Sequence, residues 1–208
     1  MRTSVKILVV IALVFSASYA QAQTSFGIKG GMNIANVTIS SGSFSVTPDS
    51  KIGINLGLVS ETLLAKDFYL QSGLIYTTKG FIVKNPENDD QKMTMSTNNI
   101  EIPINALYKL NVGSVKLLGF GGPYIGYSIS GKTKVGNESE DIKFSGDNKE
   151  MNAFDFGFNI GAGIEIQNLQ ISAQYGVGLS NLIAESDEEE GKMKNKVFGL
   201  SVAYFFGR

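Results

Sequence analysis

The sequence predicts an all-β protein, an eight-stranded antiparallel up-and-down transmembrane β-barrel. Three observations predict it: strand-length segments alternate apolar and polar side chains, long connections alternate with short ones, and an export signal precedes them. One segment has an apolar residue at every second position: Leu169, Ile171, Ala173, Tyr175, Val177 and Leu179. Because successive side chains of a strand point to opposite faces, such a segment has one apolar face and one polar face.

The export signal assigns residues 1–22 to a signal peptide and residues 23–208 to the barrel domain. Two basic residues lie in the first six, an unbroken apolar run follows at 7–15, and Ala20-Gln21-Ala22 matches a cleavage site. The apolar run is shorter than the ~20 residues that a spanning helix needs, which disfavours an uncleaved anchor helix. We expect export and residence in the outer membrane of a Gram-negative bacterium.

The first four strands alternate clearly, and they are predicted at residues 26–39, 51–60, 68–83 and 99–110. In the second strand one face holds only apolar side chains: Ile52, Ile54, Leu56 and Leu58. A gap rich in Ser and Gly separates the first two strands, and a long polar gap separates the third from the fourth. We expect Glu61, Lys66 and Asp67 in a short turn between the second and third strands.

The last four strands are predicted at residues 114–130, 153–166, 169–180 and 197–206. Tight turns are expected at Asn111-Val112-Gly113 and at Gln167-Asn168, and the remaining connections are long and polar. Glycines blur the alternation of the fifth strand, and Pro123 cannot donate a ladder hydrogen bond. We expect a bulge or local kink there.

The pattern favours a closed barrel over a soluble sandwich. The strands reach the ~9–11 residues that a tilted crossing of the membrane needs. Long and short connections alternate, as expected when turns face the periplasm and loops face outside. Lipid offers no hydrogen bonds to an open sheet edge, so the first strand must pair with the last.

Composition excludes several classes of function. Cys and His are both absent, which excludes a disulfide scaffold, cysteine-based metal or redox chemistry and Ser-His catalysis. The formal net charge is −1 and no basic stripe is present, so we expect no nucleic-acid partner. The glycines at 119–122 are not followed by a helix pattern and form no dinucleotide site. We expect no enzymatic activity, no cofactor and no metal-binding residues.

Four short motifs recur in order along the mature chain. They are Phe26-Gly27-Ile28-Lys29-Gly30-Gly31-Met32-Asn33, Leu70-Gln71-Ser72-Gly73-Leu74-Ile75-Tyr76, Ile100-Glu101-Ile102-Pro103 and Gly121-Gly122-Pro123-Tyr124. Together they resemble the PorT-like outer-membrane β-barrel family, also described as a porin family. The resemblance covers essentially the whole mature chain and implies an integral barrel surrounded by outer-membrane lipid.

The resemblance also implies recognition by the barrel-assembly machinery, which reads an aromatic residue at the end of the last strand. Here Tyr204, Phe205 and Phe206 supply aromatic side chains, but Phe206 is followed by Gly207 and Arg208. The terminal position is therefore shifted relative to the usual pattern.

The inward-facing polar residues are the candidate site. An eight-stranded barrel is just wide enough for side chains to fill it, and buried charges must pair or form hydrogen bonds. We therefore expect an interior plug of ion pairs and hydrogen bonds, with a narrow conductive path or a small-ligand pocket near Glu101 and Asp155 as the alternative. The candidates are Lys29, Gln71, Glu101, Asn105, Lys109, Lys116, Asp155, Asn159, Glu165 and Gln174.

A second candidate is the acidic run Glu185, Asp187, Glu188, Glu189 and Glu190 in the last long connection. A solvated loop tip is the simpler interpretation of such a block. Its functional interpretation is binding of divalent cations or of a basic partner at the cell surface, since Ca²⁺ and Mg²⁺ take oxygen ligands.

The sequence thus predicts a structural or surface-interaction role through four extracellular loops. A small channel or ligand-binding barrel is the alternative. A soluble lipocalin-like binder would need its apolar residues inside, whereas here the narrow, Gly-rich face is the polar one.

Overall fold

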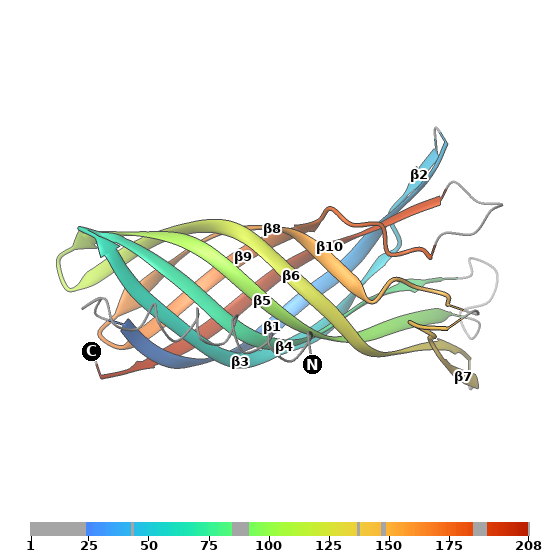
Figure 1. The fold of residues 1–208 in the computed structure, drawn as a ribbon, viewed down its shortest axis with the longest axis horizontal. Helices are drawn as coiled ribbons and strands as arrows, with labels where there is room; N and C mark the ends of the chain where they lie inside the picture. Colours follow the sequence, from blue (N-terminus) through green and yellow to red (C-terminus); the bar gives the residue numbers. More distant parts are fainter. Residues whose placement is uncertain are drawn as a thin grey trace, which may run out of the picture.

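The computed structural model describes residues 24–42, 44–84, 92–136, 138–146, 149–184 and 191–207, so the predicted signal peptide lies outside the described residues. Within them no helix is long and apolar enough to cross a membrane. The described residues form antiparallel strands (Figure 1): β1 (Thr24–Ser41), β2 (Phe44–Val46), β3 (Asp49–Ala65), β4 (Phe68–Val83), β5 (Met93–Val112), β6 (Val115–Val135), β7 (Glu138–Asp141), β8 (Phe154–Ile166), β9 (Leu169–Gly178) and β10 (Gly191–Phe206).

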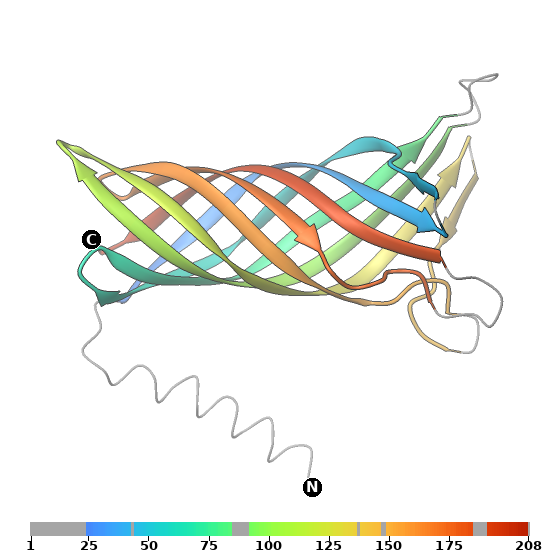
Figure 2. The same ribbon diagram turned by 90° about the horizontal axis from the view of Figure 1, so that it is seen from above.

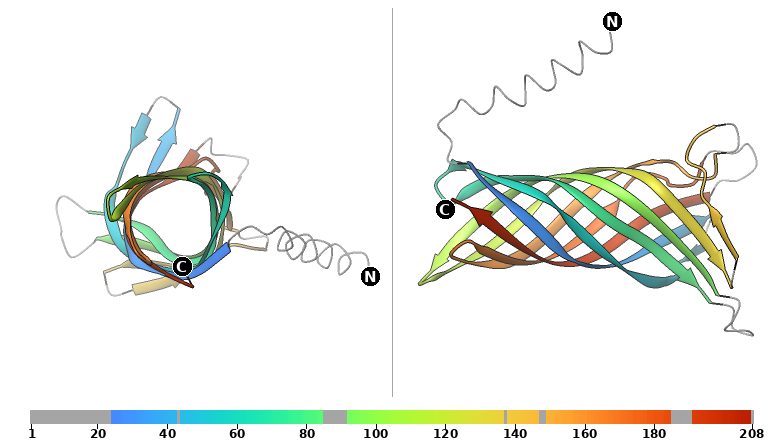
Figure 3. Two further views of the ribbon diagram at one scale, coloured as in Figure 1. Left: turned by 90° about the vertical axis from the view of Figure 1, so that its left-hand side faces the viewer. Right: turned by 90° about the horizontal axis from the view of Figure 1, so that it is seen from below.

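Apart from the short strands β2 and β7, the described strands form one closed wall in the order β1, β3, β4, β5, β6, β8, β9 and β10. The closing pair β10–β1 runs from Phe206 opposite Phe26 to Gly191 opposite Ser41. Seen along its axis, the wall is a ring (Figure 3). Closure pairs the backbone groups that an open edge would leave unsatisfied in hydrocarbon. The predicted eight-stranded up-and-down barrel is confirmed.

Three two-residue turns lie together at one end of the barrel, which we call the turn end (Figure 1). They are Lys66–Asp67, Gly113–Ser114 and Gln167–Asn168. Asp67, Gly113 and Gln167 have φ values of 63°, 63° and 54°, the positive values that tight hairpins use. The turn at Gln167-Asn168 lies where it was predicted, whereas Asn111 and Val112 still belong to β5.

The opposite end, which we call the loop end, carries strand extensions that the sequence did not predict (Figure 2). β5 begins at Met93 and β10 at Gly191, each six residues before the predicted start. β2 pairs with β1 and β7 pairs with β6, inside connections that were expected to lack strands. Both faces of an extension beyond the membrane meet water, so its sequence need not alternate in polarity.

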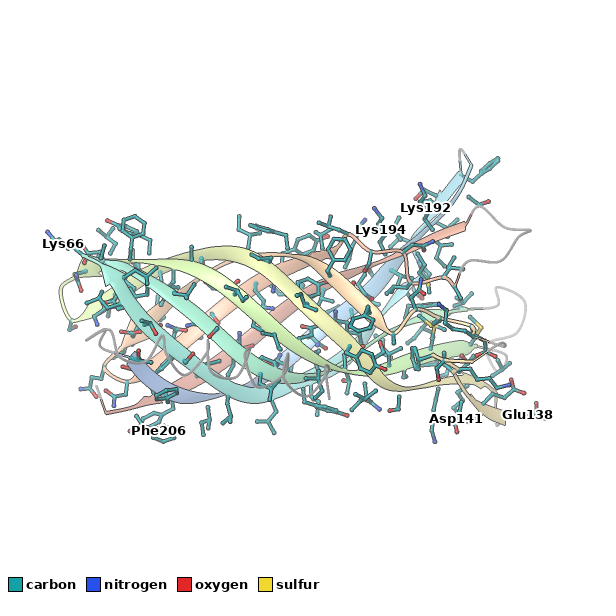
Figure 4. The ribbon with its side chains drawn as sticks, in the orientation of Figure 1. Lys66, Glu138, Asp141, Lys192, Lys194 and Phe206 are labelled. Atoms are coloured by element: carbon teal, nitrogen blue, oxygen red, sulfur yellow. The ribbon has the colours of Figure 1, made fainter. Side chains whose placement is uncertain are left out.

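The outer face of the barrel is apolar, as the alternation predicts. Ile52, Ile54, Leu56 and Leu58 are each more than half exposed, while the residues that alternate with them along β3 face the interior. Side chains project all round the wall in Figure 4, which places Lys66 and Phe206 at the turn end and Glu138, Asp141 and Lys192 at the loop end. In a membrane the exposed apolar row contacts acyl chains, and charges gather beyond it.

Of the expected bulge or local kink around Pro123, the bulge is not present. Pro103 pairs with Tyr124 and Ala106 with Gly121, so the register of β5 and β6 is the same on both sides of Pro123. The ladder only omits the pairs in between, which accommodates the missing N–H. Gly122 lies there because a Cβ would come within 1.9 Å of the Ile104 carbonyl oxygen. The register shift between these strands occurs instead at Asn98/Asn99.

Candidate functional site in the barrel interior

The barrel interior is filled by side chains arranged in layers along the axis. Inward-facing residues of the wall strands form two charged clusters, one toward the turn end and one toward the loop end. A mostly polar layer separates the two clusters, and an apolar cluster lies above the second.

The turn-end charge cluster consists of Glu61, Lys109, Lys116 and Glu165. The Lys109 ammonium contacts the Glu61 carboxylate and lies 2.6 Å from Glu165 Oε2. Lys116 Nζ lies 3.0 Å from Glu165 Oε1. Glu61, Lys109 and Glu165 are each at most 2 % exposed, so their charges are compensated chiefly by one another.

Two amides complete this cluster. Gln71 Nε2 donates to Glu61 Oε2 at 3.2 Å and to Gln170 Oε1 at 2.9 Å. The Lys109 ammonium also lies 4.4 Å from the centre of the Tyr69 ring, within range of a cation–π interaction. Two ammonium groups and two carboxylates make the cluster neutral, and it joins β3, β4, β5, β6, β8 and β9.

The loop-end charge cluster consists of Lys79, Glu101 and Asp155. Lys79 Nζ lies 2.5 Å from Glu101 Oε1 and 3.1 Å from Asp155 Oδ2. The Asp155 carboxylate accepts three further hydrogen bonds, from Tyr124 OH at 3.1 Å, Ser180 Oγ at 2.7 Å and Asn195 Nδ2 at 2.8 Å. Asp155 is therefore held by side chains from β4, β6 and β10 and from the segment after β9.

Between the clusters lies a cavity of about 40 Å³. Its lining includes Lys29, Asn33, Glu101, Asn159 and Gln174. Lys29 Nζ donates to Gln174 Oε1 at 3.1 Å, and buried Asn33 Oδ1 has no hydrogen-bond partner among the described residues. Since one water needs about 10–15 Å³ of such volume, the cavity has room for a few waters and not for a drug-sized ligand.

The apolar cap closes the interior at the loop end. It is a buried cluster of Val37, Phe81, Ile142, Met151, Leu182 and Met193. Hydrogen bonds from Asn152 N to Leu182 O and from Leu182 N to Met193 O, at 2.9 and 2.8 Å, tie its segments together. Below the cap, a cavity of about 10 Å³ separates it from Asn99, Ser128 and Asn195.

The predicted interior residues fall into separate groups and not into one network. Gln71, Lys109, Lys116 and Glu165 meet at the turn end; Glu101 and Asp155 meet Lys79 at the loop end. Lys29 and Gln174 bond to each other beside the cavity that Asn159 also lines. Asn105 is buried, and its Oδ1 has no hydrogen-bond partner in the described part of the chain.

Glu61 is the main residue that the sequence reasoning missed. It was expected in a turn, but β3 continues to Ala65 and buries Glu61 against Lys109. The alternation of the strand predicts this position. Even-numbered residues from Ile52 to Leu58 point outward, so the same period points Glu61 inward. The interior roles of Tyr124, Ser180 and Asn195 were also missed, because their partner Asp155 lies far away in sequence.

The acidic run from Glu185 to Glu190 lies outside the described residues. In the part of the chain that the structure describes, no group of three or more carboxylates is arranged to hold a metal ion. Binding of divalent cations at the loops therefore stays a prediction.

A closed wall with an apolar outer face and a charge-paired interior defines an integral outer-membrane β-barrel protein. The comparisons with known proteins agree. A family model described as outer membrane protein beta-barrel domain matches residues 19–184, and the chain belongs to this family. Comparison with curated proteins gives no match.

The chain is also similar to several solved structures. The outer membrane protein OprG from Pseudomonas aeruginosa is 12 % identical, with a TM-score of 0.51 over 90 % of this chain and 98 % of that chain. Neisserial surface protein A is 12 % identical, with a TM-score of 0.45 over 85 % and 96 %. Ail of Yersinia pestis, the attachment invasion locus protein solved with the heparin analogue sucrose octasulfate, is 17 % identical, with a TM-score of 0.42 over 88 % and 99 %.

Proposed function

We propose that this barrel is a closed membrane anchor that presents its loop end to a partner at the cell surface. The observation that carries the proposal is the filled interior. Two charged clusters and the apolar cap occupy the axis, and the cavities between and above the clusters measure about 40 and 10 Å³. A pocket of about 520 Å³, lined by Glu61, Lys109 and Lys116, opens at the turn end and stops at the first cluster. An interior of this kind supports anchoring and disfavours continuous passage of solute.

The loop end offers a surface that suits binding. Among the described strands β2 pairs only with β1 and β7 only with β6, so each leaves one backbone edge for an added strand. Phe44 and Val46 of β2 are 82 % and 63 % exposed. β7 carries Glu138, Glu140 and Asp141. Its edge is therefore acidic, whereas the β2 edge is apolar, and it suits a basic partner.

The orientation and export route are part of the same proposal. The leader at residues 1–22 supports export and cleavage, which would leave the turn end in the periplasm and the loop end outside. The ordered motifs support a PorT-like origin, and the aromatic end of β10 supports recognition by the barrel-assembly machinery. Glu185, Asp187 and Glu188 would then extend the acidic surface outside the cell.

Planar-bilayer recording of the refolded mature protein tests the closed interior. We expect no stepwise conductance from the wild type, because the apolar cap and the charge clusters leave no continuous water path. Stepwise currents from the wild type would contradict the proposal and favour the small channel. Recovery of the mature protein in the soluble periplasmic fraction would contradict the membrane anchor and favour the lipocalin-like binder.

Capture of a surface partner tests the proposed binding role of the loop end. Replacing the run Glu185–Glu190 with Ser and Asn should abolish capture of a basic partner, while folding, read from heat-modifiable gel migration, stays unchanged. If capture survives this change but is lost when β2 is deleted, the partner binds the β2 edge and the acidic run has no role.

A further inference from the structure

A groove of about 360 Å³ lies on the outside of the barrel wall, where β8 begins beside Tyr127 of β6. Its wall side is aromatic, with Tyr127 from β6 and Phe154 and Phe156 from β8. Tyr127 and Phe154 are register partners, and their ring centres lie 4.9 Å apart in an edge-to-face pair. These side chains belong to the outward row of the barrel and are about half exposed or more.

The opposite side of the groove is formed by Phe144, Lys149 and Asn152, which lie in the segment between β7 and β8. Phe144 of this segment packs against the apolar cap, so its position is set by the core of the loop end. Asn152 Nδ2 donates to the carbonyl oxygens of Asn181 and Ile183, at 2.9 Å each. Met151 forms a bridge with Ile183. Met151 and Asn152 therefore fix this side of the groove against the segment after β9.

One cation lies at the rim. Lys149 lines the groove and is exposed, and no carboxylate of the described residues forms an ion pair with it. The neighbouring Lys143 is also exposed but does not line the groove. An aromatic floor with an ammonium group at one edge matches an amphipathic anion.

The position on the wall identifies the class of ligand. Further along β8, Phe158 and Ile160 continue the same outward row, so the floor is continuous with the surface that contacts hydrocarbon. Aromatic side chains at this level are those that meet lipid headgroups. We propose that the groove binds one anionic, phosphate-bearing lipid, with an acyl chain on Tyr127, Phe154 and Phe156 and its phosphate beside Lys149.

The volume of the groove suits part of a lipid molecule. Ligand pockets range from about 300 to 1,000 Å³, so a groove near the lower limit suits one chain and the adjoining phosphate and not a whole lipid. If the barrel is oriented with its loop end outside, as proposed above, the lipid belongs to the outer leaflet. The binding chemistry itself does not depend on a surface partner or on a closed pore.

The absence of Trp from the chain permits a direct test. A single tryptophan is placed in the groove by Phe154→Trp, or on the same strand and face outside the groove by Ile160→Trp. Each full-length mature variant is reconstituted in phosphatidylcholine vesicles containing brominated phosphatidylglycerol, or brominated phosphatidylcholine as the neutral comparison. Bromine quenches tryptophan fluorescence on contact, so the quenching reports the local lipid at each site.

In the Phe154→Trp variant we expect phosphatidylglycerol to be preferred about fivefold, the effect of one cation close to an anionic headgroup. Adding Lys149→Gln should remove the preference, whereas Lys143→Gln should leave it. The Ile160→Trp variant should show none. Equal quenching by both lipids in Phe154→Trp, or a preference that survives Lys149→Gln, would overturn the proposal. If neither lipid quenches the Phe154→Trp variant while both quench the Ile160→Trp variant, protein covers the groove and the proposal is also wrong.

Discussion

At the scale of single residues, the interior shows how a membrane barrel tolerates buried charge. Glu61, Lys109, Glu165 and Lys116 alternate in sign, so each inner member contacts two opposite charges. Burying a charge is costly unless it is paired and hydrogen-bonded, and this cluster meets both conditions. The cost of removing one member is therefore the cost of an uncompensated neighbour and not the energy of a single contact.

Lys109→Met should destabilise the folded barrel by about 3–5 kcal/mol, because two buried carboxylates lose their shared cation. Urea unfolding in detergent, followed by the fraction of heat-modifiable protein on a gel, measures this change. Lys66→Met, in an exposed turn at the same end, is the matched control and should change stability by less than about 0.5 kcal/mol. The double change Lys109→Met with Glu165→Gln should recover part of the loss. A Lys109→Met barrel as stable as the control would show that water compensates the carboxylates.

Much of this site could be predicted from the sequence because the period of a strand assigns each residue to the inside or outside. Lys109, Glu165 and Asp155 were placed inside on that basis, and they are buried. Glu61 was missed because a charged residue near a turn suggests a strand end. Which inward residues meet across the barrel depends on strand stagger and tilt, and alternation carries no information about either.

At the scale of elements, the loop end differs from the wall because its strands continue where the membrane has ended. Alternation could predict the wall strands, since lipid outside and polar groups inside impose it. It could not predict β2, β7 or the early start of β5, where no apolar face is required. The apolar cap was equally hidden, because Phe81, Ile142, Met151 and Leu182 come from separate segments and show no local period.

The cap is expected to hold the segments between β7 and β8 and between β9 and β10 in place. Met151→Ala should weaken this local packing by about 2–5 kcal/mol, as for other buried large-to-small changes, and leave the barrel folded. Limited trypsin digestion should then cleave faster after Lys143 and Lys149, while the wall strands stay protected. Ser145→Ala, an exposed change on the same segment, should leave the rate unaltered. Unchanged cleavage in Met151→Ala would show that the backbone hydrogen bonds alone hold these segments.

At the scale of the whole molecule, the decisive property is which face of the ribbon meets hydrocarbon. Neighbouring residues of β8 provide the contrast: Ile160 is 62 % exposed on the outer face, while Asn159 is 5 % exposed beside the internal cavity. The chain has no Cys, so each single-cysteine variant at one of these two positions carries one spin label at a known place.

In a bilayer, a label at Ile160→Cys should be relaxed by oxygen, which partitions into lipid. Asn159→Cys should resist labelling in the folded barrel and accept the label when unfolded. Leu200→Cys on β10, also on the outer face, should behave as Ile160→Cys does. A label at position 160 that a water-soluble relaxation agent reaches more readily than oxygen does would show that the apolar row faces water, and the membrane barrel would then be excluded.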